Sequence, residues 1–93
     1  MSNGKSEDLS ELSVIGVDIG KDVFHLVGFD ATGNLVLRRR IKRLALTATF
    51  EALPRCVVGM EACLSAHFVS RTLRGLGFEP RIIPAIYVIG LRD

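Results

Sequence analysis

Two short apolar runs, each leading to a single acid, constrain the fold of this chain more than any other feature. The first covers 14–19 and contains Asp18, and the second covers 56–60 and is followed by Glu61. Nearly continuous apolar runs of this length are typical of strands that are covered on both faces. If the two strands are parallel neighbours, their carboxylates meet at one edge of the sheet, where open α/β folds place ligands. Two close carboxylates usually need a cation between them, so Asp18 and Glu61 are candidates for the beginning of a magnesium-dependent phosphoryl-transfer site. The alternatives are that Asp18 caps a turn and that Glu61 is a helix N-terminal acid favoured by the helix dipole.

The segments around these runs predict a small mixed sheet with two helices. Residues 30–34 have the composition of a hairpin connection, Pro54 ends a helical pattern, and Gly77 has the character of a helix C-cap. The expected elements, in chain order, are strands over 14–19, 23–29 and 35–41, a helix over 44–53, a strand over 55–60, a helix over 62–76 and a strand over 78–84. This α/β order, βββαβαβ with acids ending the first and fourth strands, is the arrangement of the ribonuclease H-like (RuvC-like) fold. We expect the fold to be incomplete at the C-terminus, because 85–93 is too short for more than the start of another element.

The size and composition of the chain allow one domain. Ninety-three residues with 48% hydrophobic side chains can bury one modest core. We expect this domain to cover 14–93, after a polar, disordered leader over 1–13. The sequence holds no apolar run long enough to cross a bilayer and does not open with a signal peptide, so we expect a cytoplasmic protein with no membrane partner. A formal net charge of +2 identifies no partner by itself.

A dense basic segment after the hairpin is the candidate in this sequence for contact with nucleic-acid phosphates. The basic candidates are Arg38, Arg39, Arg40, Lys42 and Arg43, together with Lys21 in the turn just beyond the first acid. The alternative is a solvated edge strand whose charges prevent pairing with another sheet. Both interpretations stay open, because alternate side chains of a strand point to opposite faces and the patch need not be continuous.

The cysteines and histidines show no metal-binding pattern. Cys56 and Cys63 lack a zinc-type spacing, and we expect both to be buried, reduced thiols. His25 falls in the second expected strand and His67 in the second expected helix. Without matching partners, we expect both to be structural histidines rather than ligands.

Three stretches of the chain resemble a known family. They are 15–22 (IGVDIGKD), 33–38 (GNLVLR) and, most specifically, 53–63 (LPRCVVGMEAC) followed by Ser65, Ala66 and His67. Over 14–88 the sequence is similar to the N-terminal part of IS110/IS1111-family transposases. These proteins have a Holliday-junction-resolvase-like domain with four acids in the order Asp, Glu, Asp, Asp (DEDD). The resemblance implies that Asp18 is the first acid and Glu61 the second, in a two-metal site that cuts and rejoins DNA at an insertion element.

The resemblance also implies that part of the site is missing. Family members continue beyond the fifth strand with a basic segment and an Asn-Asp-x-x-Asp-Ala motif, whereas this chain reads YVIGLRD over 87–93. Asp93 lacks the neighbours of that motif, and Ser65 and Ser70 do not replace the serine nucleophile of the family's distal domain. We therefore expect a truncated transposase fragment with weak or no Mg²⁺ binding and no catalysis of its own. The implied partners are DNA, an element-encoded guide RNA, and further copies of the chain or an intact transposase.

Two other functions stay open on the sequence. Asp18-Ile19-Gly20 also fits the first phosphate loop of actin-like ATPases and sugar kinases, although the second phosphate loop and the adenosine-binding segment are not found. The other alternative is a non-catalytic remnant that binds nucleic acid or dimerises.

Overall fold

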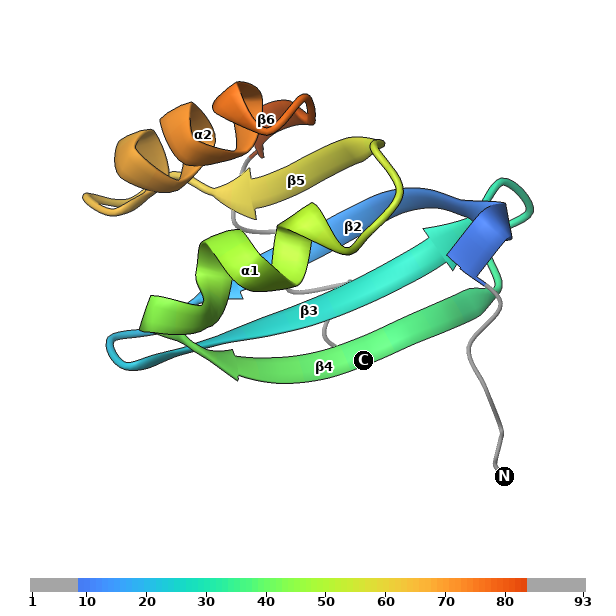
Figure 1. The fold of residues 1–93 in the computed structure, drawn as a ribbon, viewed down its shortest axis with the longest axis horizontal. Helices are drawn as coiled ribbons and strands as arrows, with labels where there is room; N and C mark the ends of the chain where they lie inside the picture. Colours follow the sequence, from blue (N-terminus) through green and yellow to red (C-terminus); the bar gives the residue numbers. More distant parts are fainter. Residues whose placement is uncertain (1–8, 84–93) are drawn as a thin grey trace.

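A five-stranded mixed sheet with both helices on one face forms the part of the computed structural model that is described here, residues 9–83 (Figure 1). In chain order the elements are the 3-10 turn η1 (Leu9–Glu11), strands β2 (Leu12–Ile19), β3 (Val23–Asp30) and β4 (Leu35–Lys42), the 3-10 turn η2 (Arg43–Ala45), helix α1 (Leu46–Glu51), strand β5 (Val57–Glu61), helix α2 (Ala66–Gly75) and strand β6 (Glu79–Ile83). No helix within residues 9–83 is long and apolar enough to span a membrane.

The strands lie in the order β4-β3-β2-β5-β6. Strands β2, β3 and β4 form an antiparallel meander, whereas β5 and β6 run parallel to β2 because each is reached through a helical crossover. The α/β class predicted from the sequence is confirmed, and the arrangement is compatible with a ribonuclease H-like fold. Strand β2, which carries the first acid, therefore lies at the centre of the sheet.

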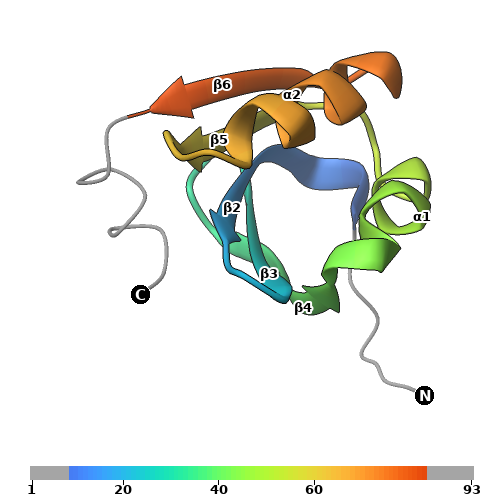
Figure 2. The ribbon, with the colours of Figure 1, turned by 90° about the vertical axis from the view of Figure 1, so that its left-hand side faces the viewer.

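The core lies between one face of the sheet and the two helices, which cover the same side (Figure 2). Helix α1 buries Leu46 and Phe50, and α2 buries Ala66, Val69 and Leu73, as their helical spacing predicts. The sheet supplies the fully buried side chains of Ile15, Val17, Phe24, Leu26, Val58 and Met60. Because side chains alternate along a strand, the residues between these face the other side. No helix of residues 9–83 covers that side, and we call it the helix-free face.

A glycine cap ends helix α2 as the sequence predicts. The backbone N–H of Gly77 donates to the carbonyl of Arg74 at 3.1 Å, and that of Phe78 donates to Leu73 at 3.0 Å. Gly77 has a φ of 95°, so these bonds form a Schellman motif with the glycine in the left-handed conformation. The buried Phe78 ring then meets Phe50 of α1 edge-on, with 5.2 Å between ring centroids.

The element boundaries differ from the prediction before β2 and before α2. Leu12 is buried in β2 and η1 precedes it, so ordered structure begins before residue 14 and the predicted leader is too long over 9–13. Helix α2 begins at Ala66, not at 62, because 62–65 form a turn in which Ala66 N–H donates to the Cys63 carbonyl at 3.1 Å. Residues 1–8, and the predicted structure over 84–93, lie outside the described residues.

Candidate functional site

Asp18 and Glu61 lie at the carboxyl ends of two neighbouring parallel strands. The register pairs Val17 of β2 with Met60 of β5, and each acid is the next residue along its strand. Val17 and Met60 are fully buried toward the helices, so the two acids, both partly exposed, belong to the helix-free face. The structure thus brings together the two acids that the sequence singles out, while their role as metal ligands stays a prediction.

A polar row continues from these acids across the sheet. Asp18 pairs with His25 of β3, and His25 in turn pairs with Arg40 of β4. Cross-strand partners have Cβ atoms about 4.5–5.5 Å apart, so Glu61, Asp18, His25 and Arg40 follow one another on the helix-free face. From its sequence context, His25 is expected to be a structural histidine. Counting outward from a two-residue turn at Lys21 and Asp22, which the hydrogen bond from Gly20 N–H to the Val23 carbonyl closes, places it opposite Asp18.

The turn that follows Asp18 is held by Arg43. Its Nε donates to the Lys21 carbonyl at 3.0 Å and its terminal nitrogen donates to the Gly20 carbonyl at 2.9 Å. The guanidinium also lies 5.0 Å from the centre of the Phe24 ring. Gly20 itself tolerates no side chain, because a Cβ there would lie 2.6 Å from the Val23 carbonyl oxygen. These contacts fix the backbone immediately beyond the first acid.

Arg43 also reaches the loop beyond the second acid. A terminal nitrogen donates to the hydroxyl of Ser65 at 3.3 Å, which joins the turn after β2 to the segment between β5 and α2. Between these two loops lies a shallow, solvent-open depression of about 420 Å³, lined on one side by Gly20 and Lys21 and on the other by Cys63 and Ser65. The two acids are not among its lining residues. This link cannot be predicted from the sequence, because no local pattern pairs residue 43 with residues 20 and 65.

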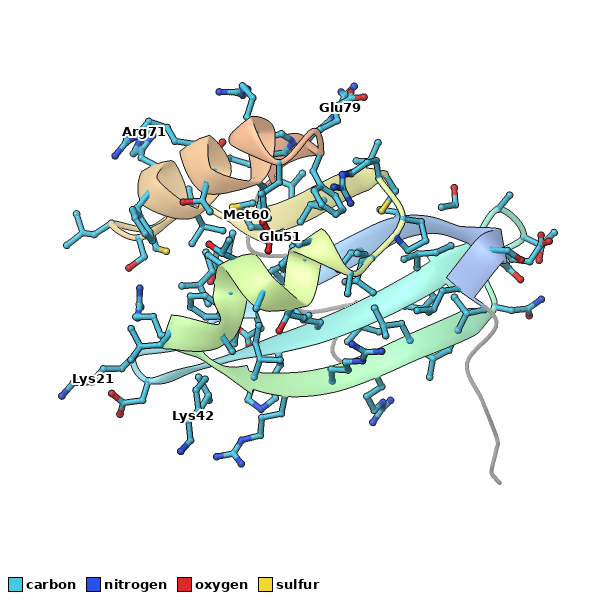
Figure 3. All side chains as sticks on the ribbon, viewed as in Figure 1. Lys21, Lys42, Glu51, Met60, Arg71 and Glu79 are labelled. Carbon is cyan, nitrogen blue, oxygen red and sulfur yellow. The ribbon has the colours of Figure 1, made fainter. Side chains whose placement is uncertain are left out.

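The basic segment is divided by the alternation of β4. Arg38, Arg40 and Lys42 alternate with the buried Leu37 and lie exposed on the helix-free face. Arg39 pairs with the buried Leu26, so it belongs to the helix side, where it makes interactions of its own. The patch is therefore not continuous, as the alternation of strand side chains allowed, and the guanidinium of Arg43 is held by the turn after β2. Contact of the segment with nucleic acid stays a prediction. Lys21 is exposed in that turn (Figure 3).

The cysteines differ from each other in environment. Cys56 is partly buried, and burial raises the pKa of its thiol to about 11. Cys63 is exposed in the turn before α2, so the prediction of a buried thiol is wrong there. Both thiols are free, as predicted. Within residues 9–83, no group of three or more His, Cys, Asp or Glu side chains is arranged to hold a metal ion.

The fold and its acid pair define a class of domain, a mixed α/β sheet with carboxylates at the ends of adjacent parallel strands. Three proteins with similar sequences are named transposases. The chain is 46% identical over 77 residues to a probable family 20 transposase of Pseudomonas aeruginosa, an alignment that covers 83% of this chain and 23% of the relative. It is 36% identical over 80 residues to the transposase for insertion sequence element IS1328 of Yersinia enterocolitica (86% of this chain, 24% of the relative). It is also 36% identical over 84 residues to the transposase for insertion sequence element IS1111A of Coxiella burnetii (90% and 23%).

The transposase relationship predicted from the sequence is confirmed at this level. The chain spans about a quarter of the length of these relatives, and the match over most of the chain fits an N-terminal transposase segment. No family model matches the chain.

Proposed function

We propose that Asp18 and Glu61 are the first half of a divalent-metal site in the DNA-cleaving domain of an insertion-element transposase of the IS110/IS1111 kind. The observation that carries this proposal is the pairing of β2 with β5, which places both acids at the same edge and on the same face of the sheet. Ligands of open α/β sheets bind at such an edge. In the DEDD order implied by the family resemblance, these residues are the first Asp and the Glu.

The chemistry of the two side chains suits Mg²⁺. Carboxylate oxygens are the ligands this ion takes in proteins, and it is often held by only one or two carboxylates together with substrate phosphates. When bound, the metal would supply positive charge at the scissile phosphate. The rest of the chain positions the two acids, because Arg43 holds the loops that follow them. With these two carboxylates alone, we expect weak metal binding.

The proposed partner is DNA, since the relatives are transposases. An element-encoded guide RNA, and co-assembly with another copy or with an intact transposase, stay predictions from the family resemblance. The relatives give no support to the alternative of an actin-like ATPase or sugar kinase, so we do not propose it.

A titration with Mn²⁺, a paramagnetic substitute for Mg²⁺, tests the metal site. In NMR spectra of the 93-residue chain, we expect selective broadening of the amide signals around Asp18 and Glu61. The variants Asp18→Asn and Glu61→Gln should each remove that broadening, because each leaves a single carboxylate. Glu51→Gln, which changes an exposed acid on α1, is the matched control and should leave it intact. Broadening that survives in both site variants, or that centres on other acids, would refute the proposal.

A further inference from the structure

We propose that Arg38, Arg40 and Lys42 form a DNA-binding strip on the helix-free face, which leads the phosphate backbone toward His25 and the acid pair. The choice of DNA as the ligand rests on the proposed function, whereas the strip itself follows from the geometry of β4. We call these three residues the basic strip. It holds three of the six basic candidates in the sequence. Arg39 faces the helix side, Arg43 is bound to the turn after β2, and Lys21 lies in that turn and not on β4.

The spacing of the basic strip suits a chain of phosphates. Its members are alternate residues of one strand, so they lie on one face about 6.8 Å apart along the strand. This repeat is comparable to the distance between successive phosphates of a nucleic-acid strand. A row of evenly spaced cations on one face can therefore contact neighbouring phosphates at the same time.

The charges of the basic strip are available for a ligand. The cross-strand partners of Arg38, Arg40 and Lys42 are Val27, His25 and Val23, none of which is acidic. Within residues 9–83, no hydrogen bond or ion pair engages these three side chains. Arg81 lies on the same face, opposite Gly59, but it is paired with Glu79.

The position of Arg40 ties the basic strip to the acid pair. Arg40 lies two strands from Asp18, with His25 between them. Neighbouring strands are about 4.7–4.9 Å apart, so this step is roughly 10 Å, which a long arginine side chain and one phosphate can bridge. His25 is exposed and carries ring nitrogens that can donate to a phosphate oxygen. The strip runs along β4 and this row runs across the strands, so a backbone that leaves the basic strip at Arg40 would pass His25 before it reaches the acids.

Edge protection is the competing explanation. Strand β4 is the outer strand of the sheet, and charged side chains on such a strand discourage pairing with another sheet. Protection requires charge on the strand but does not require that the charges share a face with His25 and the acids. The two explanations predict different behaviour when the arginines are replaced.

The test measures binding of the full chain to a short labelled DNA duplex by fluorescence anisotropy over a series of salt concentrations, with EDTA present. The variant R38Q/R40Q removes two members of the basic strip, and R71Q/R74Q removes the same charge from exposed positions of α2. Arg71 lies on the outer surface of α2, far from Lys42 (Figure 3). We expect R38Q/R40Q to weaken binding about tenfold and to lower the salt slope by about 1.8, because each lost phosphate contact removes about 0.9. R71Q/R74Q should keep the salt slope.

Equal losses in the two double variants, or no loss in either, would overturn the proposal. So would an unchanged affinity for R38Q/R40Q combined with new self-association in size-exclusion chromatography, since that result identifies edge protection. Tighter binding of a labelled RNA hairpin than of DNA through the same arginines would overturn the assignment to DNA. The variant H25A should weaken DNA binding without changing the thermal unfolding midpoint. Unchanged binding by H25A would show that His25 does not contact the DNA backbone.

Failure of the strip and failure of the metal site are distinguishable. If Mn²⁺ broadening requires Asp18 and Glu61 but R38Q/R40Q binds DNA as tightly as the parent chain, only the basic strip is refuted. If R38Q/R40Q weakens DNA binding but Mn²⁺ broadening is unchanged in Asp18→Asn and Glu61→Gln, the metal site is refuted and the basic strip is supported.

Discussion

At the scale of single residues, Arg43 contributes most to holding the candidate site together. Its guanidinium donates to two carbonyls of the turn after β2 and to Ser65 in the loop after β5. The planar fork of arginine makes such a set of bonds from one side chain, and lysine cannot. In the sequence, Arg43 belongs to the basic segment with its neighbours, because charge is evident from the local sequence. Its hydrogen bonds to residues more than twenty positions away are not evident from the local sequence.

Replacing Arg43 by lysine should destabilise the protein while keeping its charge. The loss of hydrogen bonds from a charged donor to partly buried carbonyls is expected to lower the free energy of unfolding by about 1–3 kcal/mol. Urea unfolding followed by circular dichroism measures this change. The control Arg71→Lys, at an exposed position on α2, should stay within about 0.5 kcal/mol of the parent. If the two variants unfold alike, the guanidinium does not hold the loops.

At the scale of elements, α2 offers two glycines that should respond oppositely to the same substitution. Gly77 has a φ of 95°, and a Cβ there would lie 3.4 Å from Nε of Arg55. Gly75 is helical, and a Cβ there would meet nothing within 4 Å. The first glycine ends the helix, while the second only weakens it.

The substitution Gly77→Ala should therefore lower the free energy of unfolding by about 1–2 kcal/mol, the cost of a left-handed residue with a Cβ. Gly75→Ala should raise it by about 0.5–1 kcal/mol, because alanine favours the helix. Thermal unfolding of the two single variants gives both signs in one experiment. Destabilisation by both substitutions, or by neither, would contradict the Schellman cap.

The hairpin between β3 and β4 depends on one exposed carboxylate. Asp30 accepts hydrogen bonds from the backbone N–H of Asn34 at 2.9 Å, from the hydroxyl of Thr32 at 2.8 Å and from its N–H at 3.0 Å. The Asn34 bond, followed by the Thr32 hydroxyl, holds the pKa of Asp30 below its usual 3.8. The register of this hairpin sets which β4 residues face His25.

A lowered pKa in the folded state means that the Asp30 contribution is present above pH 3.8 and is lost as the pH falls through the lower, folded-state value. Asp30→Ala should thus reduce the urea midpoint at pH 7 and reduce it less at pH values below the folded-state pKa. Unfolding curves across this acid range test the sign. An equal effect of the substitution at neutral and low pH would show that the carboxylate charge is not what holds the turn.

At the scale of the whole molecule, the sequence predicted the elements well and their long-range partners less well. Apolar runs and helical spacing are local patterns, so the strands near Asp18 and Glu61 and the inward faces of both helices followed directly from them. The approach of the two acids also followed, because a helical crossover implies parallel strands. The position of His25 required the strand register, and the role of Arg43 required contacts between distant loops. The exposed state of Cys63 was missed because helix α2 begins later than its composition suggests.

The central claim is that two acids, distant in sequence, form one cation-binding edge on the helix-free face. A crystal structure of the chain grown or soaked with Mn²⁺ tests it most directly, because anomalous scattering locates the ion independently of the protein atoms. We predict an anomalous peak contacted by carboxylate oxygens of both Asp18 and Glu61. Carboxylates too far apart to share an ion, or a peak bound only by other acids, would contradict the account.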